Sequence, residues 1–182
     1  MTDFGDVRGG AATFEAAPDA AVVDGAEGTG RAAATEQSSA LPGGGVALRL
    51  DHGTYLVDLA NVAEVTPVPD ITPLPGHPSW LCGVANWRGR VLAVVDLRPL
   101  LGLELHPQTS ASRLVILTFD GIEVAVLADA VPGVAQKPGP ARPVPVAASG
   151  LLSAVCTIEA GPASVLDAAA VVALRHQLVP AA

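Results

Sequence analysis

Two stretches of this sequence, offset by 71 residues, decide how the chain folds. They are residues 80–103, WLCGVANWRGRVLAVVDLRPLLGL, and residues 151–174, LLSAVCTIEAGPASVLDAAAVVAL. The stretches align without a gap, so that Asp96 meets Asp167 and the apolar positions keep their character. Each is typical of a strand, a turn, a second strand and a short helix, because small and β-branched runs are broken once by a turn and end at an aspartate. We therefore expect two similar β units in tandem.

Further short apolar runs flank these stretches. Each is rich in Val, Ile or Leu and ends at Gly, Pro, Asp or Asn, a pattern typical of small barrels and sandwiches. The runs lie at residues 46–50, 55–57, 62–68, 114–119 and 123–127. Residues 132–149 carry five prolines and are predicted to form a long extended loop. The sequence therefore predicts an all-β fold.

Two aspartates close the paired stretches and are predicted to cap short helices. Asp96 and Asp167 each precede a run that contains helix-forming residues. Aspartate is a favoured N-cap because its carboxylate accepts hydrogen bonds from the free backbone N–H groups of the first turn. We expect the first helix to end at Gly102 and the second to extend over residues 167–179.

The N-terminal quarter differs in composition from the rest. Residues 1–45 carry seven acidic residues against two arginines and are otherwise rich in Ala, Gly, Thr and Ser, with no hydrophobic periodicity. Such a segment buries too little apolar surface to offset the entropy lost on ordering it. We expect residues 1–45 to be a disordered acidic tail and residues 46–182 to be the folded domain, with β units at about 46–105 and 111–179.

Composition excludes several classes of function. The chain has 182 residues and a formal net charge of -8, so it lacks the clustered Lys and Arg that bind nucleic-acid phosphates. No apolar run approaches the roughly 18 residues that a membrane span needs, and no secretory signal opens the sequence. Cys82 and Cys156 are too few for a disulfide framework or a zinc site. We expect a cytoplasmic protein with no nucleic-acid partner, no membrane insertion and no cofactor or metal.

The turn inside the first stretch is where the two copies differ in kind. Residues 86–89, Asn-Trp-Arg-Gly, become Thr-Ile-Glu-Ala at residues 157–160, while the flanking apolar positions keep their character. A position needed for folding alone is expected to match in both copies. The first turn is therefore a candidate for a function that the second copy does not share.

The same turn lies in a motif that resembles a known family. Residues 83–98, Gly-Val-Ala-Asn-Trp-Arg-Gly-Arg-Val-Leu-Ala-Val-Val-Asp-Leu-Arg, are similar to the central signature of the CheW-like family, and the resemblance covers about residues 46–175. It implies two SH3-like five-stranded β-barrels around a shared core, with a short C-terminal helix and no catalytic residues. Trp87 stands where the family usually has Leu, and Ala154 replaces a usual glycine.

The resemblance also implies partners. CheW-like proteins link the cytoplasmic tips of methyl-accepting transmembrane chemoreceptors to the regulatory domain of a CheA-type histidine kinase, which would recruit this protein to membrane-associated receptor arrays. Arg88 is the central candidate for a contact, because arginine forms two directed hydrogen bonds and packs its flat face. The residues expected at the receptor and kinase interface are Val62, Glu64, Gly83, Asn86, Trp87, Arg88 and Gly89.

One pair within this set is predicted to be in contact. Strand alternation places Glu64 on the face opposite Val65, the polar side of the sheet. The second copy lacks the pair, because Gly133 and Glu159 occupy the matching positions. The resemblance implies that residues at these two positions lie near the receptor-binding surface, so we expect the Glu64 carboxylate to approach the Arg88 guanidinium within ion-pair reach.

Two other functions are alternatives to a chemotaxis adaptor. The first is a CheW-like adaptor of another chemosensory-type array, controlling surface motility or protein localisation. The second is a small β-barrel hydrolase, which needs a cluster of titratable groups in a cleft. The sequence shows no zinc-binding spacing and no aspartic-protease motif, so we expect no enzyme. The four histidines are scattered at His52, His77, His106 and His176.

Overall fold

The structure, a computed structural model, describes residues 41, 43–136, 138–144 and 150–178. The strands are β1 (Gly45–Leu50), β2 (Gly53–Asp58), β3 (Val62–Pro67), β4 (Leu81–Trp87), β5 (Arg90–Val95), β6 (Arg113–Phe119), β7 (Ile122–Ala128), β8 (Ala130–Ala135), β9 (Arg142–Pro143), β10 (Leu152–Ile158) and β11 (Gly161–Leu166). The helices are α1 (Arg98–Leu101) and α2 (Ala168–Ala173), with 3-10 turns η1 (Leu59–Asn61) and η2 (Leu174–Leu178).

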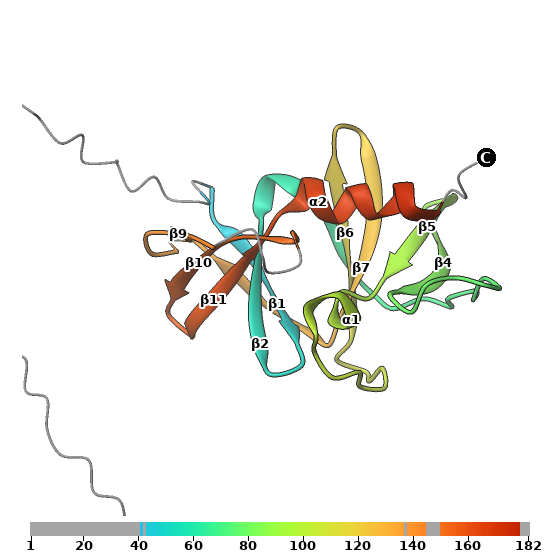
Figure 1. Ribbon diagram of the computed structural model, residues 1–182, viewed down its shortest axis with the longest axis horizontal. Helices are drawn as coiled ribbons and strands as arrows, with labels where there is room; N and C mark the ends of the chain where they lie inside the picture. Colours follow the sequence, from blue (N-terminus) through green and yellow to red (C-terminus); the bar gives the residue numbers. More distant parts are fainter. Residues whose placement is uncertain (1–40, 42, 137, 145–149, 179–182) are drawn as a thin grey trace, which may run out of the picture. The chain divides into compact units, whose positions relative to one another are not determined.

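The strands form two sheets, which we call sheet A and sheet B (Figure 1). Sheet A has the order β8-β1-β2-β11-β10-β9, and sheet B has the order β3-β6-β7-β5-β4. Neighbouring strands are antiparallel except for β2 with β11 and β5 with β7, which are parallel. The predicted β fold with a short C-terminal helix is confirmed.

The two sheets are built alike, and each takes strands from both halves of the chain. The first hairpin, β1–β2, joins the late strands β10 and β11 in sheet A, whereas the later hairpin β6–β7 joins the early strands β4 and β5 in sheet B. The sequence repeat therefore appears with its leading hairpins exchanged. The predicted units at about 46–105 and 111–179 do not coincide with the sheets, because self-similarity reveals matching segments but not which strands pair.

Each sheet is buried on both faces. The sheets share one apolar core that contains Leu48 of β1, Val115 of β6 and Val171 of α2, and α2 packs on β6 and β7. A second cluster lies on the other face of sheet A and a third on the other face of sheet B. On β6, Val115 belongs to the shared core and its neighbour Leu114 to the third cluster. Burial on both faces explains why these strands are nearly continuous apolar runs.

A short helix follows β5 and another follows β11, as the repeat predicts. Asp167 is the N-cap of α2, and its carboxylate accepts a hydrogen bond from the Ala170 N–H at 3.2 Å. The prediction for Asp96 needs correction, because the N-cap of α1 is Leu97. The Asp96 carboxylate instead accepts hydrogen bonds from the backbone N–H of Arg98 and from its buried guanidinium. Both carboxylate oxygens are occupied by these bonds.

Two boundaries differ from the sequence prediction. Leu41, assigned to the tail, is 3% exposed and packs with Leu56 in the second cluster, so the fold begins before residue 46. Part of the predicted loop at 132–149 is strand, since β8 continues through Pro132. Proline is tolerated there because β8 is an edge strand of sheet A. Residues 1–40 and residue 42 of the predicted tail lie outside the described residues.

Candidate protein-interaction site

The candidate site is centred on the tight turn between β4 and β5. Trp87 pairs with Arg90, which leaves Arg88 and Gly89 as the two loop residues. Both have positive φ, 51° for Arg88 and 78° for Gly89, as in the type I′ turn that fits the twist of a hairpin. The side-chain oxygen of Asn86 accepts a hydrogen bond from the Gly89 N–H at 3.0 Å. Asn86 and Gly89 thus shape the turn that presents Arg88.

Arg88 adopts this conformation at a cost in free energy. The left-handed region is disfavoured by roughly 1–2 kcal/mol for a residue with a side chain, and type I′ turns favour Asn, Asp or Gly. In the neighbouring hairpin, between β6 and β7, Asp120 and Gly121 occupy the two positions with φ of 49° and 73°. Backbone strain clusters at functional positions. Arg88 is therefore a candidate for such a position, and its side chain is 71% exposed.

Glu64 on β3 fixes the Arg88 side chain. Its Oε2 atom lies 2.8 Å from Arg88 Nη2 and accepts a hydrogen bond from Trp87 Nε1 at 2.9 Å. The Arg88 guanidinium carbon lies 5.3 Å from the Trp87 ring centroid, within cation–π range. The predicted approach of Glu64 to Arg88 is confirmed. The hydrogen bond from the indole is a further contact that the sequence did not indicate.

These contacts tie together the two edges of sheet B. The edge strands are β3 and β4, and Glu64 reaches from the first to Trp87 and Arg88 at the end of the second. A pocket of about 270 Å³ lies between them, with Leu114 and Ala125 among its apolar lining. The carboxylate, the indole and the guanidinium therefore form one connected surface over a closed sheet.

Val62 and Gly83, also predicted at the interface, are held by packing. Val62 is half-buried against the shared core. Gly83 is buried with a φ of 136°, and a Cβ there would come within 2.2 Å of the Thr72 carbonyl oxygen. This close approach allows Thr72 to pair with Val84. The predicted residues that the structure brings together at the surface are Glu64, Asn86, Trp87, Arg88 and Gly89.

A buried ion-pair network, which was not predicted, joins the two sheets. Arg98 is 3% exposed, and it binds Asp96 through Nη2 at 2.8 Å and Asp129 through Nη1 at 2.7 Å. Asp129 in turn accepts a hydrogen bond from the Asp51 N–H in the β1–β2 turn. Hydrogen bonding to Asp96 raises the pKa of Arg98. The signal in the sequence was the spacing of Asp96 and Arg98, which places opposite charges two residues apart.

The two cysteines are poor nucleophiles. Burial raises the pKa of the Cys82 thiol to about 11 and also raises the pKa of Cys156, so both stay protonated at neutral pH. Within the described ranges, no three His, Cys, Asp or Glu side chains are grouped to hold a metal ion. Over the same part of the chain, no helix combines the length and apolar character needed to cross a membrane.

The sequence is similar to a known domain family and to several characterised proteins. Residues 44–176 match the CheW-like domain family. The chain is 33% identical over 94 residues to Protein PilI of Pseudomonas aeruginosa, covering 52% of this chain and 53% of that protein. It is 36% identical over 89 residues to Chemotaxis protein CheW of Thermotoga maritima (49% and 58%) and 37% identical over 81 residues to Protein FrzA of Myxococcus xanthus (43% and 49%). The chain spans about half the length of these relatives.

A solved structure shows the same fold. The scaffolding protein TtCheW from Thermoanaerobacter tengcongensis matches with a TM-score of 0.62 at 24% identity, over 70% of this chain and 90% of that chain. The shared fold is one in which two similarly built sheets pack around a common core. With its family match over residues 44–176, this chain belongs to the CheW-like domain family.

Proposed function

We propose that this chain is a cytoplasmic adaptor that couples transmembrane chemoreceptors to a CheA-type histidine kinase. The observation that carries the proposal is Arg88, which is exposed, strained, fixed by Glu64 and Trp87, and absent from the second copy. A guanidinium held in this way offers two directed hydrogen bonds to a carboxylate or amide of a partner. Because the side chain is already oriented, less rotamer entropy is lost on binding.

The choice of partners rests on family membership. Chemotaxis protein CheW of Thermotoga maritima is among the relatives, which supports a receptor and a histidine kinase as the two partners. Relatives with other names, PilI and FrzA, support a second candidate, an adaptor of another array that controls surface motility or protein localisation. Trp87, where the family usually has Leu, is the feature of this chain that favours a distinct receptor.

Binding to two separate fragments tests this function. We would titrate the full chain with the receptor cytoplasmic tip and with the kinase regulatory domain by calorimetry, using parent, Arg88→Ala and Arg142→Ala. Arg142 is the matched control, an exposed arginine of sheet A. Arg88→Ala is expected to weaken receptor binding about tenfold or more, which is about 1.4 kcal/mol, and Arg142→Ala to bind as the parent does. Unchanged receptor binding by Arg88→Ala would contradict the site, and a parent that binds neither fragment would contradict the function.

A further inference from the structure

The pocket beside Arg88, which we call the sheet B pocket, has a buried apolar floor. Its volume is about 270 Å³. The floor is formed by side chains of the third cluster that come from four strands, β4 to β7, and each is nearly inaccessible to solvent. These residues are Ala85, Leu92, Leu114, Ile116 and Ala125. The pocket is therefore a recess in the surface that reaches the interior of sheet B.

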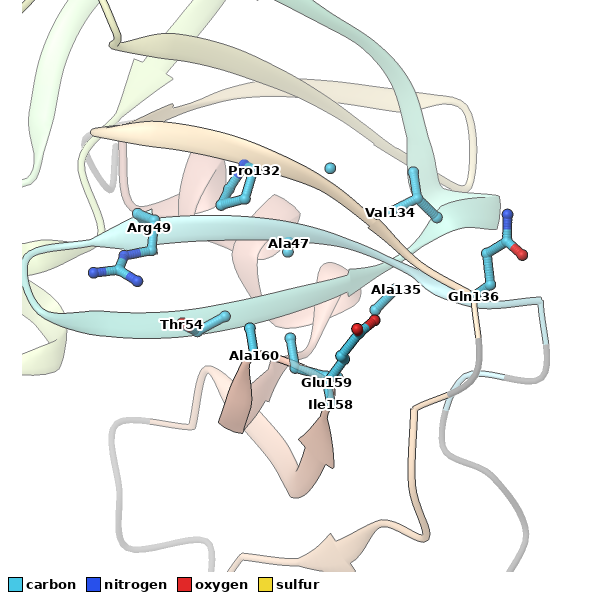
Figure 2. Close-up of a pocket in the computed structure, with 11 residues that line it drawn as sticks. Ala47, Arg49, Thr54, Pro132, Val134, Ala135, Gln136, Ile158, Glu159 and Ala160 are labelled. Atoms are coloured by element: carbon cyan, nitrogen blue, oxygen red, sulfur yellow. The ribbon is translucent and has the colours of Figure 1, made fainter.

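The larger groove over sheet A has a different character. Its volume is about 750 Å³, and Figure 2 shows it over β1, with Arg49, Thr54 and Glu159 among the residues around it. Of the residues that line this groove, Ala47 alone is buried, whereas Arg49, Val134 and Glu159 are exposed. The groove is a surface of largely exposed residues. The sheet B pocket is the one of the two that offers an enclosed apolar site.

Two alanines create the space in the sheet B pocket. Ala85 of β4 pairs with Leu92 of β5, and Ala125 of β7 pairs with Ile116 of β6. Each pair therefore places a small side chain beside a large one within the third cluster. Protein interiors are close-packed, and apolar volume left empty reduces stability. A side chain that enters from outside would remove this cost.

The rim of the pocket is polar and is held in place. Glu64 and Arg88 form an ion pair across it, and Glu64 also accepts the hydrogen bond from Trp87. Trp87 is half-buried against the third cluster, so its ring is one wall of the pocket. Thr66 and Asn86 complete the polar part of the lining. An apolar recess edged by a few fixed polar groups is typical of a site that receives an anchor side chain.

We propose that the sheet B pocket receives one apolar side chain, between leucine and phenylalanine in size, from the protein that Arg88 binds. A cavity of about 150 Å³ holds benzene, so the larger volume of this pocket accommodates an aromatic ring and the carbon that joins it to a backbone. Because Arg88 stands at the edge of the same pocket, a segment bound to its guanidinium lies over the recess. The source of the side chain rests on the proposed function, under which it is the receptor cytoplasmic tip.

The pocket and Arg88 have different roles in this interaction. The charge at the rim is balanced, because Glu64 and Arg88 carry opposite charges. Directed hydrogen bonds from the guanidinium orient the partner, whereas burial of an apolar side chain contributes free energy in proportion to the apolar area removed from water. We therefore expect the occupied pocket to be the main source of affinity.

Methyl NMR of the full chain, with toluene as a probe, tests the pocket without any partner. Toluene at millimolar concentration is expected to shift the methyl resonances of Leu92, Leu114 and Ile116, which line the pocket. The resonances of Leu48, in the shared core, are expected to stay in place. Ala125→Leu fills the recess and is expected to abolish the shifts. Absent shifts in the parent, or equal shifts in Ala125→Leu, would overturn the proposal.

The melting temperatures of filling variants show whether the space is available. Ala125→Leu and the smaller filler Ala85→Val are expected to melt at or above the parent temperature, because the added methyl groups enter empty volume. The matched control is Ala163→Leu. Ala163 is also buried but lines neither pocket, so overpacking there is expected to lower the melting temperature. A loss in both fillers as large as in Ala163→Leu would overturn the proposal.

Calorimetric titration with the receptor tip tests the source of the side chain. Ala125→Leu is expected to weaken receptor binding about tenfold or more and to bind the kinase regulatory domain as the parent does. Receptor binding by Ala125→Leu equal to that of the parent would overturn the proposal, even where Arg88→Ala weakens binding. A parent that does not bind the receptor tip would contradict the proposed function and this source, whereas the toluene shifts would still decide whether the pocket accepts a side chain.

Discussion

Among single residues, Arg88 occupies a position that the backbone alone would not assign to arginine. It has the left-handed conformation that Asp120 adopts in the neighbouring hairpin, where aspartate is a preferred residue. The equivalent residue of the second copy, Glu159, does not have a positive φ. The turn itself therefore does not require a guanidinium. The contacts of Arg88 with Glu64 and Trp87 give the side chain a fixed orientation instead.

Replacing Arg88 by asparagine is expected to separate stability from function. Relief of left-handed strain is worth roughly 1–2 kcal/mol, whereas an exposed ion pair contributes about 0–1 kcal/mol. Arg88→Asn is therefore expected to raise the free energy of unfolding by about 1 kcal/mol in urea titrations, while receptor binding falls. A stability loss of more than about 1 kcal/mol would show that folding requires the arginine.

Gly83 is expected to be needed for folding. Alanine there meets the Thr72 carbonyl oxygen and also keeps an unfavourable φ, whereas Gly76 has positive φ in open space. Gly83→Ala is expected to lower the free energy of unfolding by about 3 kcal/mol or more. Gly76→Ala, which isolates the backbone strain, is expected to lower it by about 1 kcal/mol. Thermal and urea unfolding of the two variants measure these losses. If Gly83→Ala lost no more stability than Gly76→Ala, a small backbone shift would relieve the clash and Gly83 would have another role.

Among strands and helices, the sequence located the elements well but did not show how they pair. Apolar runs marked most strands, because both faces of each sheet are buried. The prolines of residues 132–149 predicted a loop where β8 lies. Proline is compatible with an edge strand, but the sequence does not reveal which strand is at the edge. Alternation placed Glu64 on the polar face of its strand, and the family resemblance added the prediction that it would approach Arg88. The bond from Trp87 was not predictable, because indole orientation depends on the closure of sheet B.

The two aspartates that match in the repeat are expected to differ in their contributions to stability. Asp167 caps α2, so Asp167→Ala is expected to cost about 1 kcal/mol. Asp96 pairs with the buried Arg98, and its removal leaves a buried charge short of a partner. Asp96→Ala is therefore expected to cost about 3 kcal/mol or more. Urea unfolding of both variants measures the difference, and equal losses would indicate that Asp96 acts only on the helix.

The molecule as a whole contains two similarly built sheets that differ in how their edges are joined. Glu64 bridges the edges of sheet B, and Gly133 leaves the corresponding opening in sheet A. The 71-residue self-similarity predicted two similar β units. It could not predict the exchange of hairpins, because strand pairing depends on contacts between segments distant in sequence. The network of Asp96, Arg98 and Asp129 shows the same limit, since it forms only once the sheets are assembled.

Acid stability is expected to depend on the contact between the β1–β2 turn and the loop after α1. A hydrogen bond from His106 holds the pKa of Asp51 below its ordinary value of 3.8. A lowered carboxyl pKa stabilises the folded state above the ordinary value, and this contribution is lost as the pH falls through the lower folded value. In NMR titrations, His106→Ala is expected to raise the pKa of Asp51.

The pH dependence of stability in His106→Ala provides a second measurement. The stability difference between parent and His106→Ala is expected to be present above pH 3.8 and to shrink as the pH falls further. An Asp51 pKa that is the same in both proteins would show that the hydrogen bond does not form in solution.

The central claim is that the surface formed by Glu64, Trp87 and Arg88 couples a receptor to a kinase. The most direct measurement is kinase autophosphorylation in vesicles that carry the receptor, with the cognate CheA-type kinase and the full chain added. The parent and Arg142→Ala are expected to place the kinase under receptor control. Arg88→Ala is expected to remain folded and to leave kinase activity independent of the receptor. Full receptor control by Arg88→Ala, or none by the parent, would contradict the claim.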